Sequence, residues 1–373
     1  MNCEIEFLPV GASSKPGDAI VIRYGFEGNY ALMVVDGGTL ETGDDLVKHL
    51  RLHFGQNVSL EHVLLTHPDA DHASGLRTLL EQISVKNLWL HVPWLHAAEA
   101  LPYFANKSWT EAGLSAAIKK EYELIAEIVD TAVSKGVKIN PAFAGNAVGP
   151  FRVLSPSREL YVRLLPQFDR TPAPDQAELE SEGVWIGKQL FPASLFAGLM
   201  QKVGEKIQKW VPESWNGERL KEGGKTSATN ESSVVLYGTF PTQRVLLTGD
   251  AGVWGLTHAA NHADGCGLPL QNFNFVQIPH HGSRRNVGPL ILNRILGPIR
   301  SQYESPRFEA FVSAPAEDDS HPRKMVLNAF IRRGGRVTIT QGGKKIYYGG
   351  FPRRPNYSDA VSFPFSPMVE EYD

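Results

Sequence analysis

Residues 66–75 read Thr-His-Pro-Asp-Ala-Asp-His-Ala-Ser-Gly, and this stretch decides how the rest of the chain is interpreted. A buried-type apolar run precedes it and leucines at helical spacing follow it, so the stretch is expected to join a strand to a helix. His67, Asp69 and Asp71 alternate along the loop, and His72 adjoins them. Imidazole and carboxylate groups this close together can direct ligands at two nearby metal ions. The stretch therefore predicts a metal-ligating loop at a strand end.

Three later strands are also predicted to end in side chains of the kinds that bind metals. These endings are Asp250 after the strand 244–247, His280 and His281 after 273–278, and His321 several residues after 308–313. Each motif by itself could be an ordinary turn, cap or surface feature. Because sites in α/β proteins form where strand ends meet at one sheet edge, the four endings together favour a single site.

Strands and helices alternate along the N-terminal half, which predicts an α/β layered fold. Helices are expected at 44–54, at 111–135 as one continuous helix, and at 325–332. The runs 337–340 and 344–348 are expected to close the domain as a hairpin around Gly342-Gly343. The strands are expected at 5–10, 19–24, 31–35, 60–65, 87–92, 137–139, 151–154, 233–237, 244–247, 273–278 and 308–313.

Residues 1–350 are interpreted as one domain, and residues 351–373 as a Pro-rich, irregular tail. The pattern changes within residues 166–228, where prolines and scattered charges surround an apolar helical stripe from Phe196 to Trp210. We interpret this stretch as an insertion or lid within the domain, with the stripe packed on the core.

The composition of the 373 residues excludes several classes of protein. With 42% hydrophobic and 21% charged residues the chain is globular, and two cysteines are too few for a disulfide framework or a cysteine-based zinc module. The start of the chain does not resemble a signal peptide, and no apolar run is long enough to span a membrane, so a cytoplasmic protein is expected. The net charge is −3, but residues 280–355 carry +9 and the remainder −12. The net charge excludes a protein that binds nucleic acid through an overall basic surface, but it leaves room for a local basic face.

The stretch Thr66–Gly75 resembles the first ligand motif of the metallo-β-lactamase superfamily, most closely the ComEC-type competence nuclease domain, in which Asp occupies the position of Asp69. The residues 230–235, the Leu-Thr-Gly-Asp of 247–250 and the Pro-His-His-Gly-Ser of 279–283 resemble its later motifs in the same order. His321-Pro322 resembles the distal His-Pro element, and Asp36-Gly-Gly the early turn. The resemblance covers about residues 4–350.

This resemblance implies a four-layer αββα sandwich of two mixed sheets and a dinuclear hydrolase. It assigns His67 and Asp69 to one ion, Asp71, His72 and His281 to the other, and Asp250 to both. It further implies His280 as an additional ligand, Asp36 as a residue that orients a ligand, and His321 as a substrate contact or general acid. Asp71, Asp250 and His321 are the residues it implies for catalysis.

The chain departs from the superfamily pattern at the first ion. Most members supply a further histidine from mid-chain, but this sequence has none between His96 and His258. His91 and His96 are possible substitutes, although their Trp and Leu neighbours indicate core or helix positions. The first ion would then be completed by water.

A pair of divalent ions can activate water near neutral pH and clamp the oxygens of an in-line displacement. The carboxylate of Asp69 favours harder ions such as Mn²⁺ relative to Zn²⁺, and hard ions favour phosphate oxygens. Arg284, Arg285 and Ser283 are candidates for binding the substrate phosphate, although a solvated loop is an equal alternative for the arginines.

The sequence therefore favours a metal-dependent phosphodiesterase or nuclease, acting on a nucleic acid or nucleotide with two Mn²⁺ or Zn²⁺ ions. Two alternatives stay open. One is a small-molecule hydrolase, such as a lactonase or a phosphorylcholine esterase-like enzyme. The other is a non-catalytic, metal-binding regulatory protein.

Overall fold

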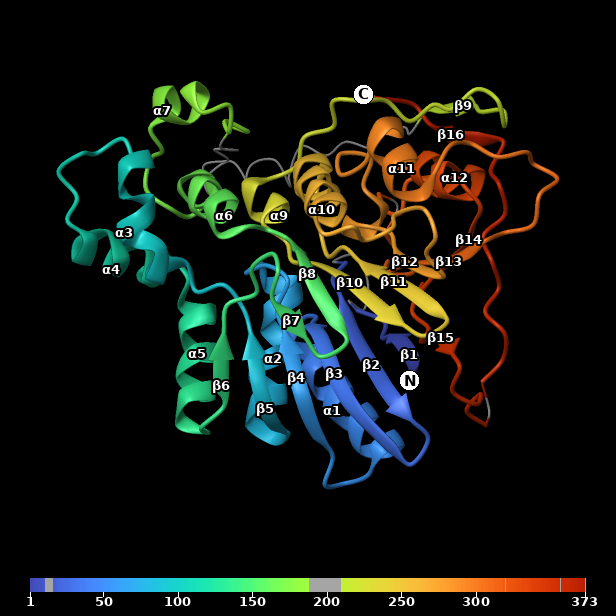
Figure 1. Cartoon of the computed structure of the whole chain (residues 1–373), viewed down its shortest axis with the longest axis horizontal. Helices are drawn as coiled ribbons and strands as arrows, with labels where there is room; N and C mark the ends of the chain where they lie inside the picture. Colours follow the sequence, from blue (N-terminus) through green and yellow to red (C-terminus); the bar gives the residue numbers. More distant parts are fainter. Residues whose placement is uncertain (11–15, 188–208, 319, 356, 373) are drawn as a thin grey trace.

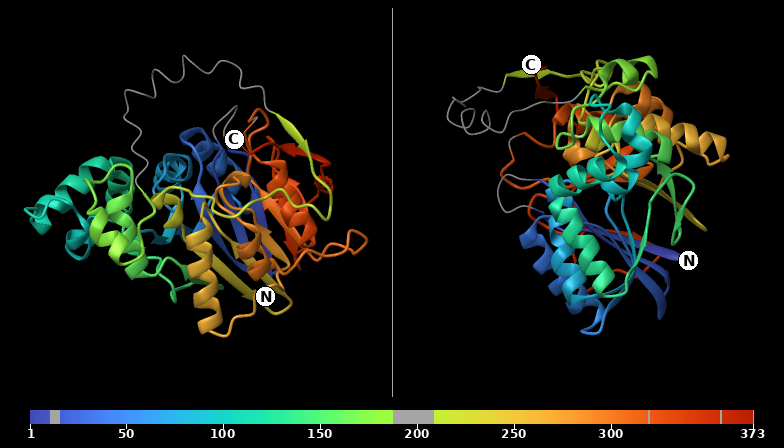
Figure 2. Two further views of the ribbon diagram at one scale, coloured as in Figure 1. Left: turned by 90° about the horizontal axis from the view of Figure 1, so that it is seen from above. Right: turned by 90° about the vertical axis from the view of Figure 1, so that its left-hand side faces the viewer.

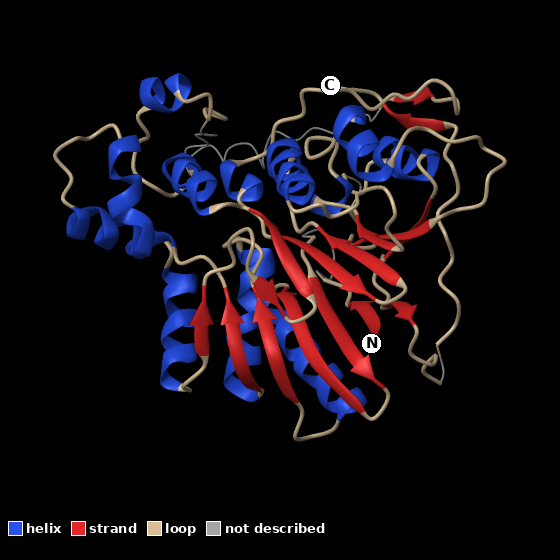
Figure 3. Ribbon diagram, in the orientation of Figure 1, coloured by secondary structure: helices blue, strands red, loops and turns tan. Residues whose placement is uncertain are grey.

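Two seven-stranded mixed sheets form the centre of the molecule, as a computed structural model describes it for residues 1–10, 16–187, 209–318, 320–355 and 357–372. Figure 1 shows the chain coloured along its sequence, and Figure 3 shows the strands in the middle with helices on both outer sides. The predicted α/β sandwich of two mixed sheets is confirmed. Within the described ranges, no helix combines the length and the apolar character needed to cross a bilayer.

Each sheet has three antiparallel pairings followed by three parallel ones. The first sheet has the order β15-β1-β2-β3-β4-β5-β6, and its parallel strands begin at β3. Its strands are β1 (Asn2–Phe7), β2 (Ala19–Phe26), β3 (Asn29–Gly37), β4 (Ser59–Leu64), β5 (Ser84–Trp89), β6 (Lys138–Asn140) and β15 (Lys345–Gly349).

The second sheet repeats this plan from the later part of the chain, in the order β14-β13-β12-β11-β10-β8-β7, with β11 to β14 parallel. Its strands are β7 (Ala147–Val148), β8 (Phe151–Ser155), β10 (Val235–Phe240), β11 (Gln243–Leu247), β12 (Phe275–Gln277), β13 (Phe308–Val312) and β14 (Gly335–Ile339).

Helices cover the outer face of each sheet, which Figure 2 shows from two further sides. On the first sheet's side these are α1 (Leu40–Phe54), α2 (Ala70–Gln82) and α5 (Glu123–Ser134). The helices α3 (Ala97–Ala100), α4 (Glu111–Glu121), α6 (Arg158–Leu164) and α7 (Gln176–Ser181) lie beyond the strand ends, at the upper left of Figure 1. Those on the second sheet's side are α10 (Val253–Gly265), α11 (Pro289–Leu296) and α12 (Lys324–Arg332), and α9 (Ala228–Glu231) contacts α6 and α10.

Three apolar clusters separate the four layers. One lies between the first sheet and its helices, a second between the second sheet and α10 to α12, and a third between the two sheets. The third cluster contains Phe7, Leu64, Phe275 and Phe311, all buried. Burial of both faces explains why the parallel strands read as continuous apolar runs instead of alternating ones.

Helix α2 lies unusually close to β3, and this explains the glycine that ends the quoted motif. A Cβ on Gly75 would stand 2.0 Å from the carbonyl oxygen of Gly37. Only glycine permits this approach of two backbones. The first turn of α2, which contains Asp71 and His72, therefore lies close to the end of β3.

Three sequence predictions are wrong in their local structure. The helix expected over 111–135 is two helices, because Tyr122 takes a non-helical conformation (φ −112°, ψ 46°) while its ring is buried in the core. The hairpin around Gly342-Gly343 does not form, since β14 pairs with β13 in one sheet and β15 with β1 in the other. The tail is not wholly irregular, because β16 (Met368–Glu370) pairs with β9 (Trp210–Pro212).

Most of the apolar stripe predicted between Phe196 and Trp210 lies outside the described residues, and the interpretation of 166–228 as an insertion or lid stays a prediction. The described parts of that stretch include α7, β9 and α9.

Candidate metal centre

The carboxyl ends of the parallel strands from both sheets meet at one edge, and the predicted ligands lie there. His67 follows β4, Asp250 follows β11, and the 3₁₀ turn His280–Gly282 follows β12. Because the two sheets repeat one strand plan, these ends face each other across the sandwich. The tertiary structure thereby brings together residues separated by more than 200 positions.

The carboxylate of Asp250 stands at the centre of four imidazole rings. Its Oδ2 atom lies 3.5 Å from His72 Nε2, 3.6 Å from His280 Nε2, and 3.8 Å from the Nε2 atoms of both His67 and His281. These distances are too long for hydrogen bonds. Two ligand atoms that each stand ~2.0–2.1 Å from one tetrahedral ion are separated by about 3.4 Å, so the spacing fits groups that share ions.

Four of these ligand atoms are buried without a hydrogen-bond partner among the described residues. They are the Nε2 atoms of His67, His72 and His281, and Oδ1 of Asp250. Each buried polar atom without a hydrogen-bond partner destabilises the fold by ~1–3 kcal/mol. Four such atoms in one cluster therefore indicate that a bound group supplies the missing partners. Divalent cations would satisfy all four, and the residues therefore fit a metal centre.

The remaining predicted ligands complete a second, overlapping group. Ligand atoms of Asp71, His72 and His281 lie within 4.8 Å of one another, as do those of His67, His72 and Asp250. Asp69 stands at the rim, with Oδ2 3.5 Å from His67 Nε2 and 45% of its side chain exposed. The structure thus brings all seven predicted ligands together.

Hydrogen bonds behind the rings fix which nitrogen of each histidine faces the centre. His72 Nδ1 donates to Asp36 Oδ2 (2.8 Å), His281 Nδ1 to the carbonyl of Ser313 (3.2 Å), and His280 Nδ1 to Asn286 Oδ1 (2.7 Å). Nδ1 is thereby engaged away from the centre in all three histidines, and Nε2 is the nitrogen that faces Asp250.

Asp36 also orients the loop that carries His67. It accepts hydrogen bonds from the backbone N–H and the hydroxyl of Thr66, both at 2.7 Å, and it is completely buried. The Thr66 oxygen in turn accepts from His67 Nδ1 (2.9 Å). One buried carboxylate thus supports two of the histidines.

The backbone has a sparsely populated conformation in the turn at Asp36 and in the turn at His280–His281. Asp36 has φ 58°, and His280 and His281 have φ 45° and 54°. Non-glycine residues in this left-handed region are strained, and such residues cluster at functional sites. The two consecutive left-handed histidines turn their rings back toward Asp250.

Three further residues of the centre were not singled out from the sequence. Gln277 Oε1 accepts from the backbone N–H groups of Thr248 and Gly249, and its Nε2 donates to Asp18 Oδ2 (2.7 Å). Asn286 Nδ2 donates to the Asp250 carbonyl (2.7 Å). No local motif marks these residues, because each acts on a loop distant in sequence.

The buried carboxylates and imidazoles of the centre shift one another's pKa values, and Asp250 is favoured in its negatively charged form. Burial opposes the charge of Asp250, but the imidazoles of His280, His72 and His281 hold its pKa well below the ordinary value. Burial likewise opposes the charge of His72, yet the carboxylates of Asp250 and Asp36 raise its pKa well above normal. Burial raises the pKa of Asp18, in the same cluster, to about 7.

A cavity of about 330 Å³ opens beside His280. Its described lining contains three arginines, two histidines and neutral polar side chains, without a carboxylate or a large apolar group. These residues are Thr226, Ser227, Asn230, His280, Ser283, Arg284, Arg285, Ser320, His321 and Arg323. We name this cavity the cationic pocket, and its chemistry suits an oxyanion.

His321 lies in the cationic pocket and not among the histidines around Asp250. Its ring is stacked at 6.2 Å from that of His280, and its Nδ1 lies 3.2 Å from Asp318 Oδ2. The predicted phosphate contacts Arg284, Arg285 and Ser283 also line this pocket.

His91 and His96 belong to the core. Each is only 6% exposed, and the His91 ring lies 4.5 Å from the rings of both Phe143 and Tyr161. Burial lowers the pKa of His91 to about 3. Neither residue belongs to a group of potential metal ligands in the described part of the chain.

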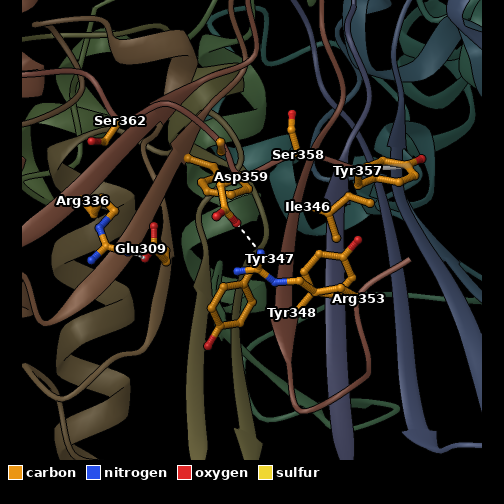
Figure 4. A pocket seen from close by; sticks show the side chains of 12 residues that line it. Glu309, Arg336, Ile346, Tyr347, Tyr348, Arg353, Tyr357, Ser358, Asp359 and Ser362 are labelled. Atoms are coloured by element: carbon orange, nitrogen blue, oxygen red, sulfur yellow. Dashed lines mark hydrogen bonds and ion pairs between the residues drawn. The ribbon is translucent and has the colours of Figure 1, made fainter. Parts of the chain in front are cut away.

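A larger cavity of about 530 Å³ lies away from the predicted ligands, along β15 and the 353–362 stretch (Figure 4). Its charged residues pair with each other, Arg336 with Glu309 at 3.0 Å and Arg353 with Asp359. None of the predicted site residues lines it.

Comparison with known proteins gives one match to a family model and several similar solved structures. Residues 15–145 match the sequence model of the Metallo-beta-lactamase superfamily, and no curated protein matches the chain. The chain is similar to the metallo-β-lactamase fold protein YhfI from Bacillus subtilis, with 10% identity and a TM-score of 0.41 over 94% of this chain and 100% of that chain. It is also similar to Zn²⁺-bound PqqB from Methylobacterium extorquens, with 12% identity and a TM-score of 0.38 over 92% of this chain and 99% of that chain. Residues 15–145, about a third of the chain, are therefore similar to the Metallo-beta-lactamase superfamily, and the two facing mixed sheets form the sandwich that this similarity implies.

Proposed function

We propose that this protein is a metal-dependent hydrolase of phosphodiesters, with nucleic acids or nucleotides as its substrates. The observation that carries the proposal is the Asp250 carboxylate surrounded by four histidine Nε2 atoms at 3.5–3.8 Å, beside a pocket with three arginines. Two divalent ions bound there would supply Lewis-acid polarisation of the scissile phosphate and activation of a water. The ComEC-type nuclease resemblance of the ligand loop supports the same substrate class.

The residues of the chain have distinct roles in this proposal. His67 and Asp69 would hold one ion, Asp71, His72 and His281 the other, and Asp250 both, with His280 available to either. The carboxylate of Asp250 would offset the repulsion between the two cations. Asp36 would keep His72 and His67 oriented with Nε2 toward the ions.

The cationic pocket would bind and orient the phosphate. Arg284 and Arg285 can bind its oxygens in pairs, and Ser283 can donate its hydroxyl. His321, whose Nδ1 faces Asp318, would present Nε2 to the leaving oxygen and donate a proton there.

A metal-dependent turnover screen tests the proposal directly. Bis-p-nitrophenyl phosphate, single- and double-stranded DNA, RNA and cyclic nucleotides are each offered with Mn²⁺ and with Zn²⁺. Hydrolysis that is lost on chelation and restored by one of the ions supports the proposal. Inactivity on all of these phosphodiesters, with turnover of a lactone or an uncharged ester instead, would favour the small-molecule alternative.

That alternative has one observation of its own. The cationic pocket holds about 330 Å³, and the chain outside residues 280–355 carries −12. A confined pocket on an acidic protein suits a small phosphodiester better than a long duplex. A non-catalytic role is disfavoured by the seven candidate ligands gathered at the centre, Asp250 included.

The choice of metal is predicted to depend on Asp69. Its side chain stands at the rim and makes no cap bond to helix α2, so Asp69→His should be tolerated. An added imidazole should move the preferred ion from Mn²⁺ toward Zn²⁺, because carboxylate oxygen suits harder ions. Activity and bound metal are measured after the apo-protein is reconstituted with each ion. A wild type that already prefers Zn²⁺, with a variant that does not differ from it, would contradict the hardness argument.

Salt dependence is predicted to separate the two substrate sizes. For a polynucleotide, Arg284→Ala/Arg285→Ala should raise KM and flatten its dependence on salt by about one unit of slope per lost phosphate contact. For a small phosphodiester KM should rise while the slope stays shallow. The pair Arg323→Ala/Lys324→Ala is measured in the same way, with Lys119→Ala/Lys120→Ala on the exposed side of α4 as the control. Unchanged KM in both pocket variants would reject a phosphate-binding pocket.

A further inference from the structure

We propose that residues 366–372, which the sequence suggests to be an irregular tail, are a positioning element that holds two parts of the lining of the cationic pocket, Arg284 and the residues before α12. The inference rests on the proposed function for its substrate, but its contacts stand independently of any reaction. We call these residues the 366–372 segment. Tyr372 and Glu370 are its positioning residues, because they act through Arg284 and through the start of α12.

The 366–372 segment is firmly anchored before it reaches the pocket. Ser366 and Asn328 exchange two hydrogen bonds, from Ser366 N–H to Asn328 Oδ1 (2.9 Å) and from Asn328 Nδ2 to the Ser366 carbonyl (2.8 Å). Val369 is completely buried in the cluster between the second sheet and its helices. Strand pairing of β16 with β9 adds a further constraint. The segment is therefore part of the packed structure.

One wall of the pocket is held through Glu370. Both of its carboxylate oxygens lie 3.0 Å from the backbone N–H of Lys324, the first residue of α12, and the side chain is 4% exposed. An acidic group at this position satisfies a free N–H of the first turn and complements the helix dipole. The pocket residues His321 and Arg323 directly precede this turn. Glu370 thus fixes the point from which they project.

The part of the pocket that contains Arg284 is held through Glu371 and Tyr372. Arg284 Nη1 donates to the Glu371 carbonyl (3.1 Å), and its guanidinium lies 4.6 Å from the centre of the Tyr372 ring. Lys221 Nζ lies 4.7 Å from the centre of the same ring, and the Lys221 N–H donates to the Tyr372 hydroxyl (2.8 Å). The ring therefore contacts two cations and is itself tied to the backbone.

These contacts should tighten anion binding without taking part in chemistry. A free arginine side chain loses much rotamer freedom when it binds an oxyanion. A guanidinium already stacked on an aromatic ring loses less, so affinity rises through preorganisation. The pocket arginine is thus predicted to owe part of its affinity to a residue 88 positions away in the sequence.

The test compares Tyr372→Leu and Tyr372→Phe with wild type. Two readouts are used, the Kd of inorganic phosphate by calorimetry and, for any phosphodiester that the protein hydrolyses, KM and kcat separately. Tyr372→Leu should raise the phosphate Kd and KM about 3- to 10-fold with little change in kcat. Tyr372→Phe keeps the ring and should stay near wild type. Glu370→Gln, which keeps an acceptor but not the charge, should weaken phosphate binding less than Tyr372→Leu does.

A double-mutant cycle makes the inference specific to Arg284. In the Arg284→Ala background, Tyr372→Leu should cause no further loss, because the ring acts through that guanidinium. Tyr303→Leu, at an 88% exposed tyrosine, is the control for loss of an aromatic residue. Far-UV circular dichroism of each variant establishes that it is folded. Additive losses, an unchanged phosphate Kd in folded Tyr372→Leu, or no phosphate binding by wild type would overturn the inference. Absence of turnover with these binding effects intact would instead count against the proposed function alone.

Discussion

Asp250→Ala is expected to abolish hydrolysis while leaving the fold intact. Its Oδ2 lies within 3.8 Å of the Nε2 atoms of all four histidines His67, His72, His280 and His281. Without it, four imidazoles face cations whose mutual repulsion is no longer offset. Lewis-acid catalysis supplies several kcal/mol of transition-state stabilisation, so the loss should be on the order of 10³-fold or more in kcat/KM. Asp71→Ala should act in the same direction, because Asp71 belongs to the second group of ligands.

Activity, bound metal and thermal unfolding are measured together on the Asp250→Ala protein. Asp264→Ala is the matched control, since Asp264 lies on the following helix α10 and forms an exposed pair with Arg294 (2.6 Å). The control should keep wild-type metal content and turnover. Near-wild-type turnover by a folded Asp250→Ala protein would contradict the dinuclear mechanism.

Asp36→Asn is expected to weaken metal binding by about 10- to 100-fold although Asp36 touches no ion in the proposed arrangement. Both oxygens of this completely buried carboxylate accept hydrogen bonds, from Thr66 and from His72 Nδ1. In the Asp36→Asn protein the amide NH₂ group, itself a donor, would face either the Thr66 N–H or the Thr66 hydroxyl and His72 Nδ1. The unpaired buried groups should also destabilise the fold by ~1–3 kcal/mol.

Metal affinity by competition with a chelator and the free energy of unfolding are the two measurements for Asp36→Asn. Asp45→Asn on α1 is the control, because the Asp45 side chain is 73% exposed and pairs with Lys48 (3.2 Å) on the same helix. Wild-type affinity and stability in the Asp36→Asn protein would show that the hydrogen bonds to Thr66 and His72 do not orient the histidines.

The ligand loops were predictable because each is short and follows an apolar run. Thr66–Gly75, Asp250 and His280-His281 could be assigned to strand ends from periodicity alone, and the structure has β4, β11 and β12 ending there. Parallel strand ends gather at one sheet edge whatever the details of packing, so the gathering of the ligands followed as well.

The predictions that failed concern pairings between distant segments. Gly342-Gly343 permits a tight reversal, but the same glycines also permit a crossing from one sheet to the other, and only the available edges of β13 and β1 decide between them. Tyr122 carries no local signal for a helix break. Its non-helical backbone accompanies burial of its ring, which depends on residues packed from elsewhere.

The sequence by itself determined the α/β class and the position of the candidate ligands at strand ends, because these depend on local periodicity and on the chemistry of side chains at strand ends. Only the tertiary structure decided what surrounds them. Gln277 and Asn286 reach loops of other strands, and Tyr372 reaches Arg284. The physical reason is that a hydrogen bond or a ring contact needs only proximity in space. Local sequence carries no record of which distant segment supplies its partner.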